Sequence, residues 1–369
     1  MNWDAILYLE RGHLFEGLGF GAEVCKGGEA VFNTGMTGYQ EIFTDPSYCR
    51  QIVVMTYPHI GNTGVNSDDP ESKRMDLSGV VTRQFCAEAS SWRSRETLGQ
   101  YLANGGIPII SDIDTRAVTQ ILRSEGAQRA VIFPKDLAKG KALSDFAQVA
   151  LKDVPDMEGQ ELVSLVSTKD PYEFTLSEES RSDAGTFVVY DYGVKSNILR
   201  HLKRRRFKVM VVPYNYPYQD VLAFKPVGVV LSNGPGDPAT VKGAVEEIQS
   251  VIGKVPVLAI CMGHQLLARA VGAKTYKLKF GHHGINQPVK DITLNRILIT
   301  SQNHGFAVRA EDIRGKDLVL SHVNLNDNTV EGFTSEKLRL YSVHVHPEAK
   351  PGPSDAAYIF DNFIRGFVK

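Results

Sequence analysis

The segment Val255-Pro-Val-Leu-Ala-Ile-Cys261-Met-Gly263-His-Gln-Leu-Leu-Ala decides the fold of the C-terminal half. Its apolar first half predicts a buried strand, and the residues from Met262 onward predict a helix that begins within a residue or two of Cys261. A strand that turns sharply into a helix at a nucleophile is a nucleophile elbow, and the small residues Ala259 and Gly263 allow the close approach that this turn needs. The helix N-terminus favours the thiolate form of Cys261. A lone Cys in an apolar run is also a common core residue, so this segment alone leaves both interpretations open.

Around this segment, apolar β-branched runs alternate with helical patterns. The runs that follow Gly185 lie at residues 187–190, 197–202, 207–213, 227–231, 245–252 and 255–260. This alternation predicts an α/β domain over residues 186–369, with a doubly wound, mostly parallel sheet covered by helices on both faces. In such sheets the ligand-binding and catalytic residues lie at the carboxyl ends of the strands. We therefore expect the functional residues to follow the strands directly.

The N-terminal half has a different pattern of apolar runs and turn residues, which predicts a mixed, β-rich α+β domain over residues 1–150. Short strand-like runs bounded by Gly, Asp and Pro lie at residues 5–9, 14–15 and 52–57. One helix is expected near Asp114, where Asp114 or Thr115 caps the first turn and Gly126 ends the helix. Residues 151–185 are polar and irregular, and we place the connection between the two domains there.

The segment His344-Val-His346-Pro-Glu348 offers a base for the cysteine. A Cys nucleophile needs a general base, and the base needs a group that orients it. In extended structure His346 and Glu348 lie on the same face of the chain, so Glu348 can hold one imidazole nitrogen while the other faces the thiol. His344 has the same parity and is a rival base.

An acyl-transfer site also needs N–H donors for the developing oxyanion. The string Asn233-Gly234-Pro-Gly236-Asp-Pro238 follows a predicted strand, and its Gly-Pro-Gly turn lets the backbone approach a ligand. The N–H of Met262 comes directly after the nucleophile and is a second donor. Such a string is also an ordinary tight loop, so its role depends on the cysteine beside it.

Length, composition and charge set the wider limits. At about 150 residues per domain, 369 residues suggest two domains, and 43% hydrophobic with 22% charged residues disfavours disorder and extended coiled coil. With 41 basic and 42 acidic side chains the net charge is −1, which argues against a nucleic-acid or anionic-membrane surface. Four scattered cysteines and no secretory leader or membrane-length apolar run favour a cytoplasmic setting. The cysteines are Cys25, Cys49, Cys86 and Cys261.

Three of these motifs, at residues 233–238, 261–265 and 346–348, resemble the class I, triad-type glutamine amidotransferases. Longer strings narrow the resemblance to the small, glutamine-hydrolysing subunit of carbamoyl-phosphate synthetase. These strings lie at residues 32–41, 44–47, 56–62, 112–116 and 280–284. The match covers essentially the whole chain.

The resemblance implies a catalytic triad, with Cys261 as nucleophile, His346 as general base and acid, and Glu348 as the group that orients His346. It also implies glutamine contacts from both halves of the chain: Ser47, Gly234, Gly236, Met262, Gln265, Asn303, Gly305 and Phe306. It implies no metal and no cofactor bound by this chain.

The resemblance further implies that glutamine is hydrolysed through a thioester and that ammonia passes to a large subunit as partner. That subunit is expected to bind ATP with Mg and bicarbonate, and to make carbamoyl phosphate for arginine and pyrimidine synthesis. The expected assembly is a heterodimer or a higher-order array of heterodimers. This chain has no phosphate-binding P-loop, and Gly17-Leu-Gly19-Phe-Gly21 lacks the spacing of a dinucleotide fingerprint, in agreement with ATP chemistry elsewhere.

Three positions depart from the family pattern. Ala259 replaces the usual first glycine of the elbow and Met262 the common leucine, and both keep the required size. The strand before the base usually ends in Gln-Gly-His or a similar string, whereas this chain has His344-Val-His346. His344 is an extra titratable group beside the triad, so we expect an altered pH profile.

Other interpretations are weaker. The basic run at residues 203–206 resembles a nucleic-acid contact, but it follows an amphipathic helical pattern and is interpreted as the solvated end of that helix. His282 and His283 have no Cys, Asp or Glu at ligand spacing nearby, so we do not expect a metal site there. An amidotransferase subunit for another synthase is disfavoured by the N-terminal strings. A non-catalytic structural subunit is disfavoured by the intact Cys261, His346 and Glu348.

Overall fold

The chain folds into two compact units. The computed structural model describes residues 2–176, 182–313 and 317–368. Unit 1 comprises Met1–Gln160 and Lys279–His283, and unit 2 comprises Glu161–Leu278 and Gly284–Lys369. The segment expected to connect the domains, 151–185, is therefore divided after Gln160, and its residues 177–181 lie outside the described ranges.

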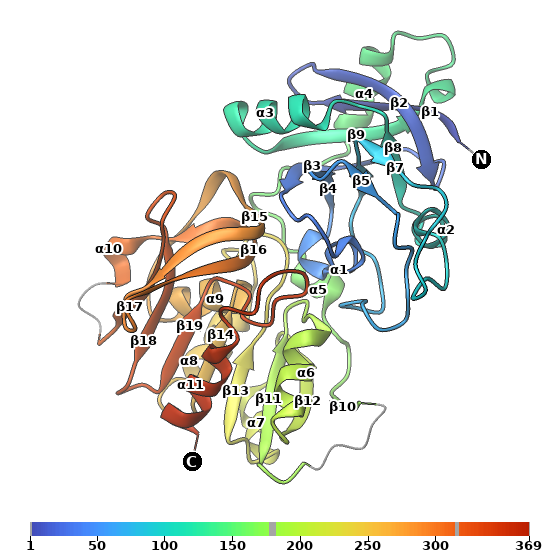
Figure 1. The fold of residues 1–369 in the computed structure, drawn as a ribbon. Coiled ribbons are helices and arrows are strands. Elements are labelled where there is room, and N and C mark those ends of the chain that lie inside the picture. The colour runs from blue at the N-terminus through green and yellow to red at the C-terminus, as the bar shows by residue number, and fades with distance from the viewer. Residues whose placement is uncertain (1, 177–181, 314–316, 369) are drawn as a thin grey trace. The chain divides into compact units, whose positions relative to one another are not determined.

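Unit 1 is built on a closed seven-stranded barrel (Figure 1). In barrel order the strands are β1 (Trp3–Leu9), β2 (Leu14–Gly21), β8 (Pro108–Ser111), β6 (Gly79–Val81), β4 (Gln51–Met55), β3 (Lys26–Asn33) and β9 (Gln128–Pro134). Two short strands, β5 (His59–Ile60) and β7 (Gln84–Phe85), form a separate parallel pair. The expected mixture of strands and helices is present. The closure of the barrel depends on pairings between distant segments, such as β1 with β9, which the local runs did not reveal.

The helices of unit 1 are short, and the best-defined one lies where the capping pattern predicted it. They are α1 (Tyr39–Phe43), α2 (Leu98–Asn104), α3 (Thr115–Glu125) and α4 (Leu143–Leu151), with 3₁₀ turns η1 (Pro46–Tyr48) and η2 (Lys135–Ala138). The Asp114 carboxylate accepts a hydrogen bond from the N–H of Ala117 at 3.0 Å and so caps α3. The helix ends at Gly126, whose φ of 103° suits glycine.

Unit 2 contains most of a ten-stranded sheet. Its order is β10 (Tyr172–Phe174), β12 (Lys208–Pro213), β11 (Thr186–Asp191), β13 (Gly228–Leu231), β14 (Val257–Ile260), β19 (Leu340–Val343), β18 (Val330–Ser335), β17 (Val319–Asn324), β15 (Thr275–Asp291) and β16 (Arg296–Val308). The five strands from β12 to β19 are parallel. Strands β10, β18, β17 and β15 pair antiparallel. The expectation of a mostly parallel sheet therefore holds only for the central block, because the later strands are joined by connections without long crossover helices.

Helices pack on both faces of the central block. The helices of unit 2 are α5 (Val163–Val166), α6 (Ser196–Arg204), α7 (Tyr218–Ala223), α8 (Ala244–Val251), α9 (Met262–Ala270), α10 (Ala310–Ile313) and α11 (Tyr358–Phe367). On one face Leu231 packs in a cluster with Ile248 of α8. On the other face Val189 packs with Leu199 of α6 and Phe360 of α11. Successive strand residues thus enter opposite cores, as expected for strands buried on both sides.

The basic run at residues 203–206 is a solvated helix end only in part, because Arg204 and Arg206 are exposed but the other two basic residues are not. Lys203 is buried and its Nζ atom donates to the Ser182 hydroxyl at 2.8 Å. Arg205 forms two hydrogen bonds to the carboxylate of Asp361 in α11, at 2.7 and 3.1 Å. The periodicity that packs α6 on the sheet also directs Lys203 and Arg205 toward neighbouring elements. These two of the four basic side chains are therefore structural.

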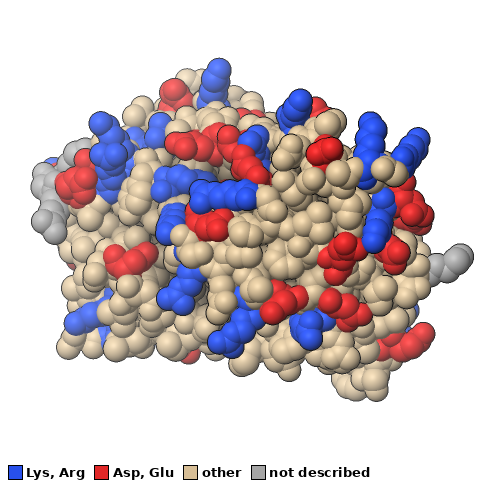
Figure 2. All heavy atoms as spheres, turned by 90° about the horizontal axis from the view of Figure 1, so that it is seen from above, with Lys and Arg blue, Asp and Glu red and all other residues tan. Residues whose placement is uncertain are grey.

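Surface charge agrees with the balanced composition. On the face that Figure 2 shows, Lys and Arg side chains are intermingled with Asp and Glu side chains. Within the described ranges no helix is both long and apolar enough to cross a membrane.

Candidate active site

Cys261 occupies the sharp turn between β14 and α9. Its φ of 52° and ψ of −106° are strained for a residue with a side chain. The Cys261 N–H donates to the carbonyl of Val343 in β19 at 3.0 Å, and the N–H of Gly263 donates to Ser232 O at 2.8 Å. A Cβ atom on Gly263 would lie 2.2 Å from Leu231 O, so only glycine fits there. The turn thus has the strand, strained residue and helix that the sequence predicts for a nucleophile elbow.

His346 and Glu348 form a buried pair just beyond β19. The Nδ1 atom of His346 lies 2.6 Å from Oε1 of Glu348, and both side chains are almost fully buried. The His346 N–H donates to Ser301 O at 2.9 Å, which fixes the backbone beside β16. The extended structure expected at this pair is not found, because β19 ends at Val343 and the pair lies in a turn. The expected contact forms through the turn instead.

Lys195 is a third buried charge, which the sequence pattern did not indicate. Its Nζ atom lies 3.0 Å from Glu348 Oε1 and donates to Ala349 O at 2.6 Å. The Lys195 N–H is held by Asn233 Oδ1 at 3.0 Å, and Asn197 donates from Nδ2 to Glu348 O. Lys195 follows β11 at its carboxyl end, which is the signal that could have identified it.

These charges control one another's protonation. Burial alone lowers the pKa of His346, but the charge of Glu348, followed by that of Cys261, raises it above the ordinary 6.5. Burial raises the pKa of Glu348, but Lys195 and His346 outweigh it and lower this pKa to about 2. At neutral pH the site therefore holds a carboxylate between two cations.

The second ring nitrogen of His346, Nε2, is the one left to interact with the cysteine, because Nδ1 is bonded to Glu348. Nε2 is buried and makes no hydrogen bond of ordinary geometry to a residue in the described ranges. Cys261 is nevertheless one of the groups that raise the pKa of His346, through charge and hydrogen bonding. The Sγ atom of Cys261 lies 3.5 Å from Asn303 O. The chemistry available here is that of a thiol beside an imidazole whose other nitrogen is held by a carboxylate.

Most residues expected to contact glutamine surround this elbow. Met262 and Gln265 lie in α9, Gly234 and Gly236 in the loop after β13, and Asn303, Gly305 and Phe306 in β16. Gln265 Nε2 donates to Phe306 O at 3.1 Å, which joins two members of the set. Ser47 lies in η1 of unit 1, where its N–H donates to Asp45 Oδ1 at 2.9 Å. The contacts of all eight residues with glutamine stay predictions.

The rival base, His344, is engaged elsewhere. Its Nε2 atom lies 2.9 Å from Nε2 of Gln265, and its ring stacks on that of His304 with centroids 3.4 Å apart. The carboxylate of Glu348 is bonded to His346. The arrangement favours His346 as the base.

Comparisons with known proteins give matches in both halves of the chain. The family profile "Carbamoyl-phosphate synthase small chain, CPSase domain" matches residues 7–132, and "Glutamine amidotransferase class-I" matches residues 188–365. A carbamoyl phosphate synthase small chain of Syntrophotalea carbinolica is 50% identical, covering 97% of this chain and 96% of its own length. The chain belongs to the carbamoyl-phosphate synthase small chain family.

Two other relatives match nearly all of this chain. The small chain of Listeria monocytogenes is 46% identical over 97% of this chain and 95% of its own length. A chloroplastic small chain of Oryza sativa is 45% identical, covering 98% of this chain and 81% of its own. The family therefore includes chains that match this one in both halves.

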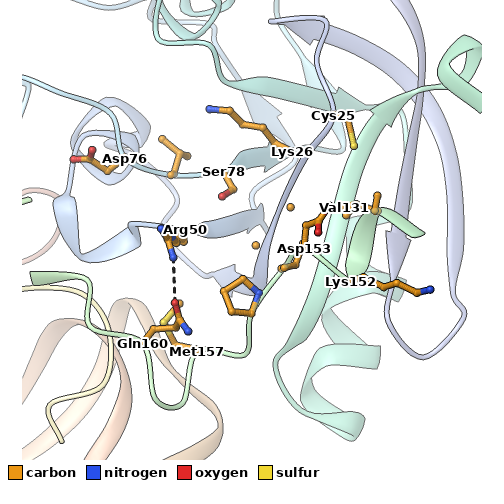
Figure 3. Close-up of a pocket in the computed structure, with 16 residues that line it drawn as sticks. Cys25, Lys26, Arg50, Asp76, Ser78, Val131, Lys152, Asp153, Met157 and Gln160 are labelled. Atoms are coloured by element: carbon orange, nitrogen blue, oxygen red, sulfur yellow. Dashed lines mark hydrogen bonds between the residues drawn. The ribbon is translucent and has the colours of Figure 1, made fainter. Parts of the chain in front are cut away.

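Unit 1 also has a cavity of its own, of about 800 Å³, but it does not have the features of the site expected for this family. Its lining includes Lys26, Arg50, Lys152 and Gln160 (Figure 3). Arg50 donates to Gln160 Oε1 at 3.1 Å, and the two lysines extend in different directions. The cations do not converge, and none of the residues expected to contact glutamine lines this cavity.

Proposed function

We propose that this chain is the glutamine-hydrolysing subunit of a carbamoyl-phosphate synthase and that Cys261, His346 and Glu348 are its catalytic triad. The observation that carries the proposal is the buried His346–Glu348 pair, bonded at 2.6 Å, beside a cysteine in a strained elbow. Family membership over both units supports the same reaction.

In the first half-reaction, the thiolate of Cys261 forms a bond to the side-chain amide carbon of glutamine. The carbonyl electrons move to oxygen, and the N–H of Met262 with that of a loop glycine stabilises the oxyanion. The oxyanion then collapses, the C–N bond breaks, and protonated His346 gives its proton to the leaving nitrogen. The raised pKa of His346 suits this step because it keeps the acid form available at neutral pH.

In the second half-reaction, His346 is neutral and removes a proton from water while the oxygen attacks the thioester. The C–S bond breaks, glutamate leaves, and the thiolate and imidazolium are restored. Glu348 holds Nδ1 throughout, so Nε2 always faces the reacting atoms. Lys195 keeps Glu348 ionised for this task.

Ammonia released into bulk water at pH 7 would be protonated, so we propose its internal transfer to a large subunit. That partner would bind ATP with Mg and bicarbonate, and would use the ammonia to make carbamoyl phosphate for arginine or pyrimidine synthesis. A heterodimer is the smallest assembly that does this. The four free cysteines support a reducing, cytoplasmic compartment for it.

The test uses the chain assembled with its large subunit. In Cys261→Ser we expect glutamate release to fall by a factor of about 10³ or more, while ammonia-driven synthesis persists. His346→Asn should stop turnover as well. Cys86→Ser is the matched control, because Cys86 lies in unit 1 and outside the triad. Retained glutaminase activity in Cys261→Ser would refute the triad.

A further inference from the structure

The side-chain amide of Gln265 is held by two acceptors. Its Nε2 atom lies 3.1 Å from Phe306 O and 2.9 Å from Nε2 of His344. An amide nitrogen only donates, and it carries two hydrogens. The main-chain carbonyl and the imidazole therefore use both N–H groups of this amide.

This contact fixes the tautomer of His344. Because Gln265 donates, Nε2 of His344 is the acceptor and carries no proton, so the neutral ring holds its proton on Nδ1. Turning the amide over would place Oε1 of Gln265 against Phe306 O, and the contact between these two acceptors would be repulsive. One orientation of the amide is thus strongly favoured, with Oε1 directed away from the two acceptors.

The ring of His344 is held by its neighbours. It stacks on His304 with centroids 3.4 Å apart and on His264 at 4.8 Å. His304 donates from Nδ1 to the same Phe306 carbonyl at 2.9 Å, and His264 Nδ1 pairs with Ser342 Oγ at 2.7 Å. The His344 N–H donates to Glu331 O at 2.8 Å. The acceptor that Gln265 meets is therefore anchored by β16, α9 and β18.

We propose that His344 is a positioning residue for glutamine binding, acting by locking the Gln265 amide so that Oε1 receives a donor group of the bound substrate. The inference rests on the proposed function, in which Gln265 contacts glutamine. Apart from the leaving amide, the α-ammonium is the donor that glutamine offers. This group does not react, so the contact is equally strong before and in the transition state. His344 should therefore act on KM and leave kcat unchanged.

Two polar variants separate the acceptor from the rest of the imidazole. In His344→Gln the side-chain amide reaches the place of Nε2 and offers a carbonyl oxygen to Gln265. In His344→Asn the amide is shorter by one methylene and reaches only the place of Nδ1. We expect KM for glutamine to rise about tenfold in the Asn variant and less than about twofold in the Gln variant, with kcat preserved in both. His264→Asn is the control for loss of a buried ring in the stack, because Asn keeps the contact to Ser342.

The decisive measurement repeats this pair in a Gln265→Met background, using the chain assembled with its large subunit. If His344 acts through Gln265, the Asn and Gln variants have the same KM once Gln265 is absent. Equal KM values in the original background, or a difference that persists in Gln265→Met, would overturn the inference. Ammonia-driven synthesis reports folding and assembly of each variant. Failure of the proposed function would appear separately, as a lack of glutamine hydrolysis by the unsubstituted chain.

Discussion

Replacing Lys195 by Met is the most direct test of how the triad is supported. The side chain of Lys195 is 3% exposed and that of Glu348 is 0% exposed, with Nζ and Oε1 3.0 Å apart. Methionine fills a similar volume without charge, so the substitution removes the cation and leaves little cavity. Glu348 then keeps His346 as its nearby cation, and Ala349 O loses the donor that it has at 2.6 Å.

The expected cost is large because a buried charge loses its partner. Removing one member of a buried ion pair costs about 3–5 kcal/mol. Because His346 still partners Glu348, we expect Lys195→Met to lower the free energy of unfolding by about 3 kcal/mol, the lower end of this range. Adding Glu348→Gln removes the stranded charge, so the double variant should lose only about 1–2 kcal/mol. Lys203→Met is the matched control. Lys203 is also buried, but within the described ranges its hydrogen bond goes to the neutral hydroxyl of Ser182. We therefore expect Lys203→Met to lower the free energy of unfolding by about 1 kcal/mol.

The two units can be followed separately. The two tryptophans, Trp3 and Trp92, both lie in unit 1, so tryptophan fluorescence during urea unfolding reports that unit. Native-state hydrogen exchange of the amides in β14 and β19 reports unit 2. We expect Lys195→Met to lower protection in these strands and to leave the fluorescence transition in place. A loss below about 1 kcal/mol, or a double variant as unstable as the single one, would refute the buried-pair argument.

Three further predictions follow from the same structure. The lowered pKa of Glu348 stabilises the folded state above pH 4.5, and this stabilisation is lost as the pH falls toward 2. The raised pKa of His346 stabilises the folded state below pH 6.5, and this stabilisation is lost as the pH rises. Exchange protection of unit 2 should therefore decline on both sides of pH 4.5–6.5, and Glu348→Gln should weaken the alkaline decline. Gly263→Ala places a Cβ atom 2.2 Å from Leu231 O and should destabilise unit 2 by about 3 kcal/mol or more, read as lost protection in β14. Asp114→Ala removes the cap of α3 and should lower the stability of unit 1 by about 1 kcal/mol in the fluorescence transition.

Elements whose causes are local could be predicted from the sequence. The turn at Cys261 needs only an apolar run, small neighbours and a helix start, all within one segment, and the structure has this turn. The same is true of α3, whose cap and stop lie at its two ends. Such features depend on backbone sterics and on groups a few residues apart, so the order of residues contains the necessary information.

Features that depend on distant residues could not be derived in this way. Lys195 is 153 residues from Glu348 along the chain, and nothing near Lys195 indicates that its charge is buried. His344 was a rival base by parity alone, because the sequence does not show that Gln265 donates to its Nε2. The pairing of His346 with Glu348 was correct, but its geometry was not, since the turn after β19 is held by contacts from other elements.

The register of the parallel strands explains why these distant residues meet. Tyr190 pairs with Leu231, Leu231 with Ala259, and Ala259 with Ser342, so the carboxyl ends of β11, β13, β14 and β19 lie side by side. Residues that follow each strand must therefore share one edge of the sheet, as open α/β sheets require. The register also selects the face that each side chain occupies. An insertion of one residue within β14 would turn Cys261 toward the opposite face and exchange the two cores on which the strand packs, so strand pairing constrains the candidate site as strictly as its charged residues do.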